Sequence, residues 1–244
     1  MLTKSTAKFI KSLQLKKYRK LEKLFVVEGA KSVQEVLEAD FRIKIILGAQ
    51  QFLETNNTDQ ADEVIAVSKK DLERLGSFKS NDGALAVVEQ KENSPLLVEN
   101  ELVLALDDIN DPGNFGTIIR IADWYGITKI VASEQTVELY NPKVIAASKG
   151  SFSRVAVFVT DLPEYISKIS VPRYGAFMDG ENIHSAKLPK VGLIVLGNEA
   201  NGISREVEQQ IDHKITIPKF GMAESLNVAM ATAVICDNFK RTFS

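Results

Sequence analysis

Cysteine and histidine are scarce in this chain of 244 residues, which contains one cysteine and two histidines. Cys236 has no partner for an internal disulfide, which is typical of a protein in a reducing cytosol, and we therefore expect a cytoplasmic location. Its apolar neighbours, and the lack of a histidine near it in sequence, predict a buried core thiol rather than a nucleophile. His184 and His213 belong to no cluster of metal-ligating residues, so we expect no metal.

Long apolar runs and a dinucleotide fingerprint are also absent. No run approaches the roughly 18 apolar residues that cross a bilayer. The lysine-rich start lacks the apolar centre and cleavage site of a secretory signal, so we expect no membrane partner. No Gly-x-Gly-x-x-Gly follows a predicted strand, which argues against a dinucleotide-dependent enzyme. With 45% hydrophobic and 25% charged residues, the composition is that of a globular protein, and the length predicts about one or two domains.

The small net charge of -2 hides an uneven distribution of charged residues. Residues 1–24 contain eight basic side chains and one acidic side chain, a net charge of +7 that leaves -9 for the remainder. A basic arm on an acidic body indicates a phosphate-binding surface, as in a nucleic-acid-binding protein. The alternatives are a solvated helix face or an organellar transit peptide, and the preference for lysine over arginine argues against the latter.

Apolar runs separated by helical stretches predict two α/β domains. The first, residues 1–95, begins with a basic helix over residues 1–23 and has strands predicted at residues 24–27, 43–47, 64–67 and 84–88. A polar stretch with a proline, residues 91–98, marks the boundary. In the second domain, residues 96–244, helices alternate with strands, which is typical of a parallel sheet. These strands are predicted at residues 102–106, 130–132, 155–158, 174–178, 192–196 and 215–217.

The first strand of the second domain leads into a turn with several polar side chains. Leu102–Leu106 is apolar throughout, as expected for a strand covered on both faces. Turn-forming residues 110–113 follow, and helical spacing begins at Asn114. Because ligands bind at the carboxyl ends of the strands in open α/β sheets, Asn110, Asn114 and Arg120 are predicted to belong to a site.

Two later strand ends have a similar character. The strand at residues 192–196 runs into Gly197-Asn198-Glu199, where glycine lets the backbone approach a ligand closely. Taken in isolation, these residues are better interpreted as a tight turn with a solvated glutamate. After the last predicted strand, Glu224-Ser225 is expected to cap a helix. Asn227 would then lie in the first helical turn, where a buried amide needs a polar partner.

The three junctions together resemble the motifs of a known family. The segments NDPGNFGTIIR (110–120), LGNEANGIS (196–204) and IPKFGMAESLNVAMA (217–231) are similar, in this order, to the three motifs of the SpoU (TrmH) family of RNA ribose methyltransferases in the SPOUT superfamily. The first segment varies from the motif in the two residues that follow Asn110.

A looser resemblance covers the first domain. Tyr18-Arg19-Lys20, residues 25–29 and Ser80-Asn81-Asp82-Gly83 are similar to the substrate-binding domain that precedes many SpoU catalytic domains. That domain is similar in fold to ribosomal proteins that bind RNA kinks. The resemblance to the family therefore extends over essentially the whole chain.

The resemblance implies a fold and a reaction. The fold would be α/β, with a small RNA-binding domain like a ribosomal protein, then a parallel-sheet SPOUT domain with a carboxyl-terminal trefoil knot. The family transfers a methyl group from S-adenosyl-L-methionine to a ribose 2′-hydroxyl of RNA and acts as a homodimer. We expect 23S ribosomal RNA as the substrate, with tRNA as the alternative. A catalytically inactive RNA-binding protein is a further alternative, which the presence of all five polar motif residues disfavours.

The resemblance also implies roles for individual residues. Those implied in catalysis are Asn114, Arg120, Glu199, Ser225 and Asn227. Those implied in cofactor binding are Leu196, Gly197, Asn198, Glu199, Ile217, Pro218 and Leu226. Those implied in RNA binding are Lys16, Lys17, Arg19, Lys20 and Lys31. Because a guanidinium stays protonated, Arg120 as a general base would need a large pKa depression. A clamp on the target phosphate that also stabilises a developing alkoxide is the simpler hypothesis.

Overall fold

The computed structural model describes residues 1–78, 81 and 83–241. It divides into two compact units. The amino-terminal unit comprises Met1–Glu92 and Glu138–Ser153, and the carboxyl-terminal unit comprises Asn93–Val137 and Arg154–Ser244. Ser80 and Asp82, which belong to the predicted substrate-binding motif, lie outside the described residues.

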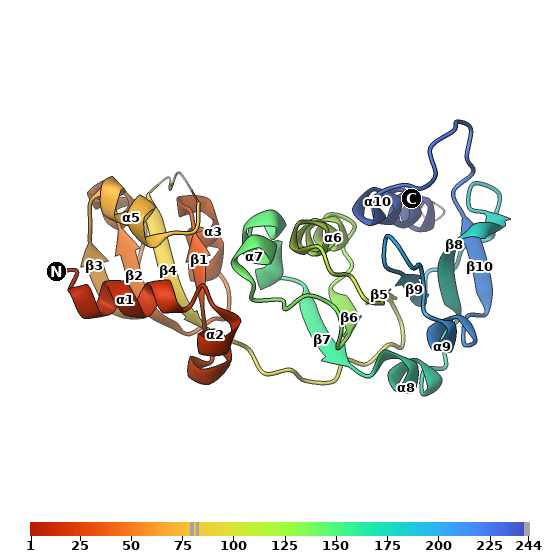
Figure 1. The fold of residues 1–244 in the computed structure, drawn as a ribbon, viewed down its shortest axis with the longest axis horizontal. Coiled ribbons are helices and arrows are strands. Elements are labelled where there is room, and N and C mark those ends of the chain that lie inside the picture. Colours follow the sequence, from red (N-terminus) through yellow and green to blue (C-terminus); the bar gives the residue numbers. More distant parts are fainter. Residues whose placement is uncertain (79–80, 82, 242–244) are drawn as a thin grey trace. The chain divides into compact units, whose positions relative to one another are not determined.

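A four-stranded mixed sheet forms the centre of the amino-terminal unit, in the order β1-β4-β2-β3 (Figure 1). Strand β4 is antiparallel to both β1 and β2, whereas β2 and β3 are parallel. All four strands were predicted from the sequence, and their bounds are β1 Leu24–Glu28, β2 Ile43–Gly48, β3 Ala61–Ala66 and β4 Ala84–Glu89. The helices of this unit are α1 Lys4–Ser12, α2 Lys16–Glu22, α3 Ala30–Leu37, α4 Gln50–Thr55, α5 Lys69–Leu75 and α7 Pro142–Ser148, with a 3-10 turn η1 at Ser151–Ser153.

Two helices, α1 and α2, occupy the region where one helix was expected over residues 1–23. The cause is the Arg19 side chain, whose Nη1 donates to the carbonyl oxygens of Leu13 and Gln14, at 2.9 and 2.7 Å. These carbonyls would accept backbone N–H groups in a continuous helix. Leu13 is buried with Ile10, so the apolar face of α1 ends at this break.

The segment 138–153 packs within the amino-terminal unit, although the sequence grouped it with residues 96–244. Phe25 of β1 meets Tyr140 and Phe152, with ring centroids 4.5 and 5.9 Å apart. Phe41 meets Phe25 and Phe152 at 6.0 and 5.9 Å. Aromatic packing of this kind is favourable beyond its buried area. It gives residues 138–153 a hydrophobic attachment that no local pattern reveals.

Six parallel strands form the sheet of the carboxyl-terminal unit, in the order β10-β8-β9-β5-β6-β7. Their bounds are β5 Leu102–Leu106, β6 Lys129–Ser133, β7 Ala156–Thr160, β8 Arg173–Asn182, β9 Gly192–Leu196 and β10 His213–Thr216. The predicted parallel sheet is thus confirmed, and every residue of β5 is buried as expected. The helices are α6 Pro112–Trp124, α8 Leu162–Ser167, α9 Arg205–Glu208 and α10 Val228–Arg241.

The direction of strand addition reverses between β5 and β9. The chain adds β6 and β7 on one side of β5 and then places β9, β8 and β10 on the other side. In doubly wound sheets, the crevice outside the carboxyl ends of two such strands is the usual ligand site. The loops that leave β5 and β9 are therefore the parts of the fold that can form one.

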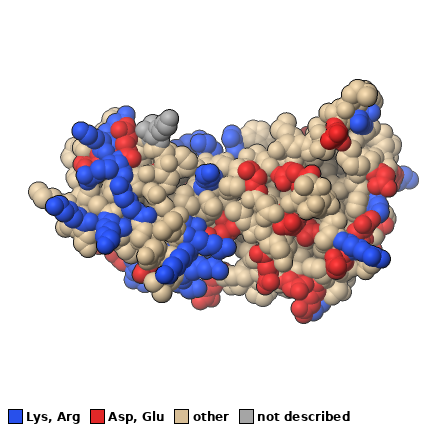
Figure 2. Space-filling view, in the orientation of Figure 1, with Lys and Arg blue, Asp and Glu red and all other residues tan. Residues whose placement is uncertain are grey.

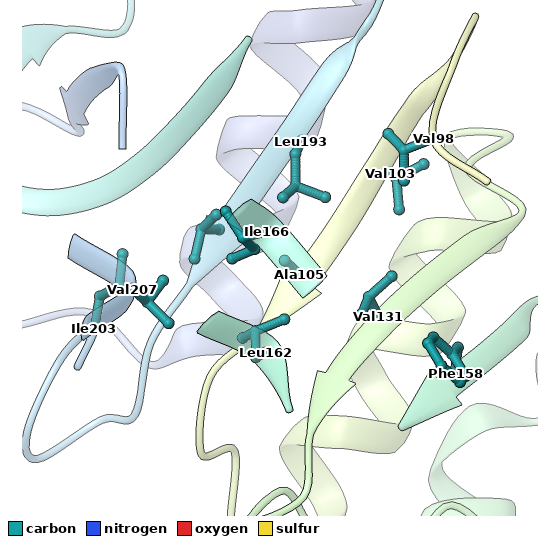
Figure 3. Close-up of a cluster of buried hydrophobic side chains, with 11 residues drawn as sticks. Val98, Val103, Ala105, Val131, Phe158, Leu162, Ile166, Leu193, Ile203 and Val207 are labelled. Carbon is teal, nitrogen blue, oxygen red and sulfur yellow. The ribbon is translucent and has the colours of Figure 1, made fainter. Parts of the chain in front are cut away.

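A buried cluster fixes these strands on one face of the sheet (Figure 3). Val103 and Ala105 of β5 pack there with Val131, Leu193 and Val195 of the neighbouring strands. Helices α8 and α9 add Leu162, Ile166 and Val207. The alternate residues of β5 point to the opposite face, because side chains alternate along a strand. In the part of the chain that the structure describes, every helix is too short or too polar to span a bilayer.

Candidate active site at the carboxyl ends of β5 and β9

The loop after β9 is closed tightly upon itself. A Cβ atom at Gly197 would lie 2.2 Å from the carbonyl carbon of Gly202 and 2.3 Å from the nitrogen of Ile203, so only glycine fits. Asn198 and Gly202 exchange two backbone hydrogen bonds, at 3.0 and 2.9 Å. The Asn198 side chain accepts from the backbone of Ala200 at 2.8 Å. We call residues 197–203 the glycine loop; these contacts give it one defined shape.

Two hydrogen bonds attach the glycine loop to the end of β5. Asn198 Nδ2 donates to the carbonyl oxygen of Asp108 at 2.8 Å. Just beyond the loop, the backbone N–H of Ser204 donates to Oδ2 of Asp107 at 2.7 Å. Asp107 is buried, and a carboxylate buried at a strand end needs such a donor. Asp107 therefore sets the position of the loop, a role that the sequence patterns did not predict.

Helix α6 begins two residues earlier than its apolar spacing predicted. Asp111 is its N-cap, and the Asp111 side chain accepts from the backbone N–H of Asn114 at 2.8 Å. Pro112 occupies the first turn, where its missing N–H costs nothing. Asn114 therefore lies in the first turn of α6, and its Nδ2 donates to Oε1 of Glu199 in the glycine loop. Asn110 lies outside this contact and bonds Asp108.

Asn227 is the N-cap residue of α10. Its Oδ1 accepts from the backbone N–H groups of Ala229 and Met230, at 2.9 and 3.3 Å, and α10 begins at Val228. Asn227 Nδ2 donates to Oδ1 of Asn114 at 2.9 Å. The prediction that Ser225 caps this helix is therefore wrong. Asn227, two residues later, caps it instead, because its amide can accept from the helix and also donate to Asn114. Ser225 lies exposed in the preceding loop.

Asn227, Asn114 and Glu199 form a chain of hydrogen bonds in which each side chain donates to the next. The N-terminus of α10 donates to Asn227, Asn227 donates to Asn114, and Asn114 donates to Glu199. An amide both accepts and donates, so each asparagine is held in one orientation by its neighbour. The Glu199 carboxylate at the end of the chain is therefore aimed by groups from two helices.

Arg120 and Ser225 take no part in this chain of hydrogen bonds. Arg120 is exposed on α6, six residues beyond Asn114, which is about 9 Å along a helix. Within residues 1–78, 81 and 83–241, no hydrogen bond or ion pair engages its guanidinium or the Ser225 hydroxyl. The structure thus brings together three of the five predicted catalytic residues and leaves two open to other groups.

The predicted cofactor residues lie at the ends of β9 and β10, in the glycine loop and in the loop that follows β10. Leu196 ends β9, and Ile217 and Pro218 follow β10, half-buried. No backbone hydrogen bond joins residues 218–226 to another part of the described chain, and Leu226 is exposed. Free peptide groups beside apolar side chains suit a ligand with a planar heterocycle and hydroxyl groups, since such ligands are held mostly by apolar contact and a few polar groups.

Comparison with known proteins assigns this arrangement to a family. The sequence model of the SpoU rRNA Methylase family matches residues 101–237, which is more than half of the chain. The chain belongs to the SpoU rRNA Methylase family. The match includes all three strand ends described above, and the MRM3-like substrate binding domain matches residues 4–86.

Individual proteins match over 92% or more of the chain. The 23S rRNA (guanosine(2553)-2′-O)-methyltransferase RlmP of Bacillus subtilis strain 168 is 28% identical over 229 residues, covering 92% of each chain. A structure from Porphyromonas gingivalis, assigned to the TrmH family of RNA methyltransferases, is 36% identical with a TM-score of 0.91 and covers 99% of both chains. An AdoMet-bound rRNA methyltransferase from Sinorhizobium meliloti is 25% identical, with a TM-score of 0.89, over 100% of this chain and 97% of that chain.

The predicted RNA-binding residues of this SpoU chain differ in their environments. Lys16, Lys17, Lys20 and Lys31 are exposed. Arg19 is 2% exposed, and its Nε and Nη2 donate to the two carboxylate oxygens of Glu138 at 3.0 and 2.7 Å. The prediction for Arg19 is wrong, because a guanidinium with its donors used inside the protein cannot also bind a phosphate. The adjacent lysines gave no signal of this difference.

The remaining reactive side chains are held in the fold. Cys236 is buried as expected, and burial raises the pKa of its thiol to about 12, so it stays protonated at neutral pH. His184 Nδ1 lies 3.2 Å from Oδ1 of Asn238, and the His213 ring stacks on Tyr174 with centroids 4.7 Å apart. Over the described ranges, no three His, Cys, Asp or Glu side chains are grouped as a metal site.

Proposed function

We propose that this protein transfers a methyl group from S-adenosyl-L-methionine to a ribose 2′-hydroxyl of RNA, with 23S ribosomal RNA as the substrate. The observation that carries the proposal is the hydrogen-bonded chain Asn227–Asn114–Glu199, which joins all three family motifs at the sheet's switch point. The RlmP protein of Bacillus subtilis, which matches over 92% of each chain, is named for this reaction on 23S rRNA.

The residues at the strand ends fit the cofactor. Its adenosine would lie against the glycine loop and residues 217–226. The peptide groups of residues 218–226 are free, and Leu226 is exposed. S-adenosyl-L-methionine, when bound, supplies a sulfonium methyl group and its own leaving group. The protein then has to orient a ribose hydroxyl in line with that methyl group and assist loss of its proton.

Arg120 supplies positive charge for the incoming RNA. Its exposed guanidinium is engaged by no described residue, so its fork of donors is available for a phosphate and for a developing alkoxide. Glu199, aimed by Asn114, supplies an acceptor near the same sheet edge. In this proposal Ser225 adds a hydroxyl from the loop before α10, and the proton passes to phosphate or water.

A second copy of the chain is proposed to cover the paired helices α6 and α10. Hydrogen bonds join the two helices near both ends. On their outer sides Trp124 is 84% exposed and Met230 is 61% exposed, with Ile121, Ala233 and Val234 half-buried beside them. An apolar patch on a face formed by two helices is typical of a protein interface. Arg120 precedes Trp124 by four residues and so lies on the same side of α6, where a homodimer would bring it to the interface.

Sedimentation tests the homodimer. Trp124→Asp and Met230→Asp are expected to shift the protein to monomer and to reduce methyl transfer. Leu97→Asp, at an exposed leucine on another part of the carboxyl-terminal unit, is the matched control and should leave the assembly unchanged. A wild-type monomer at the concentration of the activity assay would end this part of the proposal.

A trefoil knot in the carboxyl-terminal segment is also part of the proposal. Its support is that the chain leaves β10 at one edge of the sheet and returns to α10, which packs on α6. The crossing order of residues 190–241 in a crystal structure tests this, and an unthreaded crossing would contradict it. A cytoplasmic location stays a prediction from the single cysteine, to be checked by fractionation.

Labelled methyl transfer tests the reaction itself. Total RNA from a strain that lacks this protein is incubated with labelled cofactor and the purified protein, then separated by size and mapped with nucleases. We expect alkali-resistant label in 23S ribosomal RNA. Label in tRNA would keep the chemistry and change the substrate. No label, with the cofactor bound in calorimetry, would favour an RNA-binding protein without catalysis.

A further inference from the structure

Helix α2 contributes one buried side chain to its unit. Of residues 16–22, only Arg19 is buried, and its guanidinium bonds both carboxylate oxygens of Glu138 and the carbonyls of Leu13 and Gln14. A surface helix ordinarily buries an apolar stripe instead. Here an ion pair holds the helix, so its other side chains are free to serve another purpose.

The apolar side chains of α2 face outward. Leu15, Tyr18 and Leu21 are all exposed, Tyr18 by 36%. Leu15 is the N-cap residue of α2. Because residues three apart lie on one side of a helix, Tyr18 and Leu21 form a short outward row, which Leu15 continues at the start of the helix. Leaving such a row in water is costly unless a partner covers it. The row therefore points to a binding surface, which we call the α2 surface.

Lysines surround this row. Lys16, Lys17, Lys20 and Lys23 are exposed, and none of them forms an ion pair with any other residue in the described part of the chain. The Lys17 ammonium lies 5.9 Å from the centre of the Tyr18 ring. In Figure 2 basic side chains gather over α1 and α2 on the visible face of the amino-terminal unit. The partner of the α2 surface therefore carries negative charge as well as apolar or planar groups.

An unpaired stretch of RNA has this combination of groups. Its phosphates match the lysines, and its splayed bases can stack on an aromatic ring, whereas a duplex keeps its bases inside. A membrane would require a larger apolar face than three side chains on a two-turn helix. Charge complementarity together with the exposed ring thus favours single-stranded RNA.

We propose that the α2 surface binds an unpaired segment of the substrate RNA, with a base stacked on Tyr18 and phosphates held by Lys16, Lys17 and Lys20. Arg19 is the positioning residue that fixes this helix through Glu138. The proposal rests on the RNA substrate of the proposed function and deepens it, because it makes the nucleotides bound by the amino-terminal unit unpaired ones.

Binding of fluorescent RNA to the full chain tests the proposal. The probes are an unstructured 12-nucleotide RNA and the duplex of the same sequence. Tyr18→Ala is expected to weaken binding of the single strand about 5- to 150-fold, the range for loss of one base–aromatic stack, and to leave duplex binding unchanged. Tyr18→Phe should retain binding. Phe78→Ala removes a ring of the same unit that is 37% exposed and is the matched control.

The salt dependence of binding distinguishes the contribution of the Tyr18 ring from that of the lysines. Lys17→Gln with Lys20→Gln should lower the slope of log K against log salt by about 1.4, since each phosphate contact on a single strand contributes about 0.7. Tyr18→Ala should leave that slope unchanged. Equal single-strand binding by wild type and Tyr18→Ala would overturn the proposal. So would a lower unfolding midpoint for Tyr18→Ala, which would make the ring structural, or binding to phosphatidylserine vesicles in place of RNA.

Methyl transfer distinguishes failure of this proposal from failure of the proposed function. If wild type methylates RNA and Tyr18→Ala does so with unchanged KM for RNA, the α2 surface is excluded and the reaction stands. If no RNA is methylated but single-strand binding depends on Tyr18 as expected, the surface stands and the reaction falls.

Discussion

At the residue scale, Asn227 combines a structural and a functional role in one amide. Its oxygen caps α10 and its nitrogen donates to Asn114. A capping residue needs only an acceptor, and aspartate or serine would serve as well. The second role, holding Asn114 so that it can aim at Glu199, requires a donor. Asparagine provides both groups, and this explains the residue type at the start of α10.

Substitution of Asn227 should separate the two roles. Asn227→Asp keeps the cap and places negative charge at a helix N-terminus, so we expect unchanged stability but loss of methyl transfer, because the donor to Asn114 is gone. Asn227→Ala should lose the same activity and also about 0.5–2 kcal/mol of stability. Urea unfolding and methyl transfer measured on both variants check this. Full activity of Asn227→Asp would show that the bond to Asn114 has no role.

Gly197 makes a second prediction at this scale. In Gly197→Ala the added Cβ meets the loop backbone at 2.2 Å, so the glycine loop must open. We expect loss of S-adenosylhomocysteine binding in calorimetry and about 1–3 kcal/mol lower stability. Gly126→Ala is the control. Its φ of 63° makes alanine costly, but no atom lies within 4 Å of a Cβ there and the residue lies outside the proposed cofactor site, so stability should fall while binding is kept. Normal binding by Gly197→Ala would mean that the shape of this loop does not determine the cofactor site.

At the element scale, the contact between α2 and residues 138–153 depends on the Arg19–Glu138 pair. The side chains are 3% and 15% exposed, so neither charge is well solvated if the other is removed. Arg19→Leu is expected to cost about 3–5 kcal/mol, the usual effect of breaking a buried ion pair. The double variant Arg19→Leu with Glu138→Leu should recover most of this loss, since it leaves no unpaired charge.

Urea unfolding of both single variants and the double variant measures the coupling between Arg19 and Glu138. If the loss of unfolding free energy in the double variant equals the sum of the losses in the two single variants, Arg19 and Glu138 have no coupling energy. Helix α2 should also detach in Arg19→Leu, and single-strand RNA binding should then fall along with stability.

At the scale of the whole molecule, the residues that match the SpoU family model do not all belong to one compact unit. The family model extends over residues 101–237, yet residues 138–153 pack against β1 of the amino-terminal unit. An excised fragment of residues 96–244 would therefore expose Tyr140 and Phe152, which lose the rings of Phe25 and Phe41. The predicted boundary between residues 95 and 96 remains a useful position for testing this.

The fragment of residues 96–244 is expected to associate and to bind a hydrophobic dye more than the full chain does. The Cys236 thiol reports on the fold of the carboxyl-terminal unit, because burial raises its pKa to about 12 and should make labelling at pH 8 slow until the unit unfolds. Fast labelling of the fragment and slow labelling of the full chain would agree with the prediction. A soluble fragment with slow labelling would show that the aromatic contacts are dispensable.

The sequence alone determined the strands and their order along the chain. All ten strands of the described residues, the parallel second sheet and the location of the site at strand ends followed from apolar runs, turn residues and three motifs, because these signals are local and each spans only a few residues. Asn114, Glu199 and Asn227 were predicted together with Arg120 and Ser225, and the structure brings the first three together.

Only the tertiary structure decided which polar side chains are used internally. Arg19 lies among exposed lysines in sequence, yet its partner Glu138 is 119 residues away. Ser225 and Asn227 are both good capping residues, and the position of Asn114 on another helix makes Asn227 the better one. Residues 138–153 join the amino-terminal unit through rings on distant strands and loops. Burial and hydrogen bonding between distant segments follow from packing, and a local pattern carries no record of them.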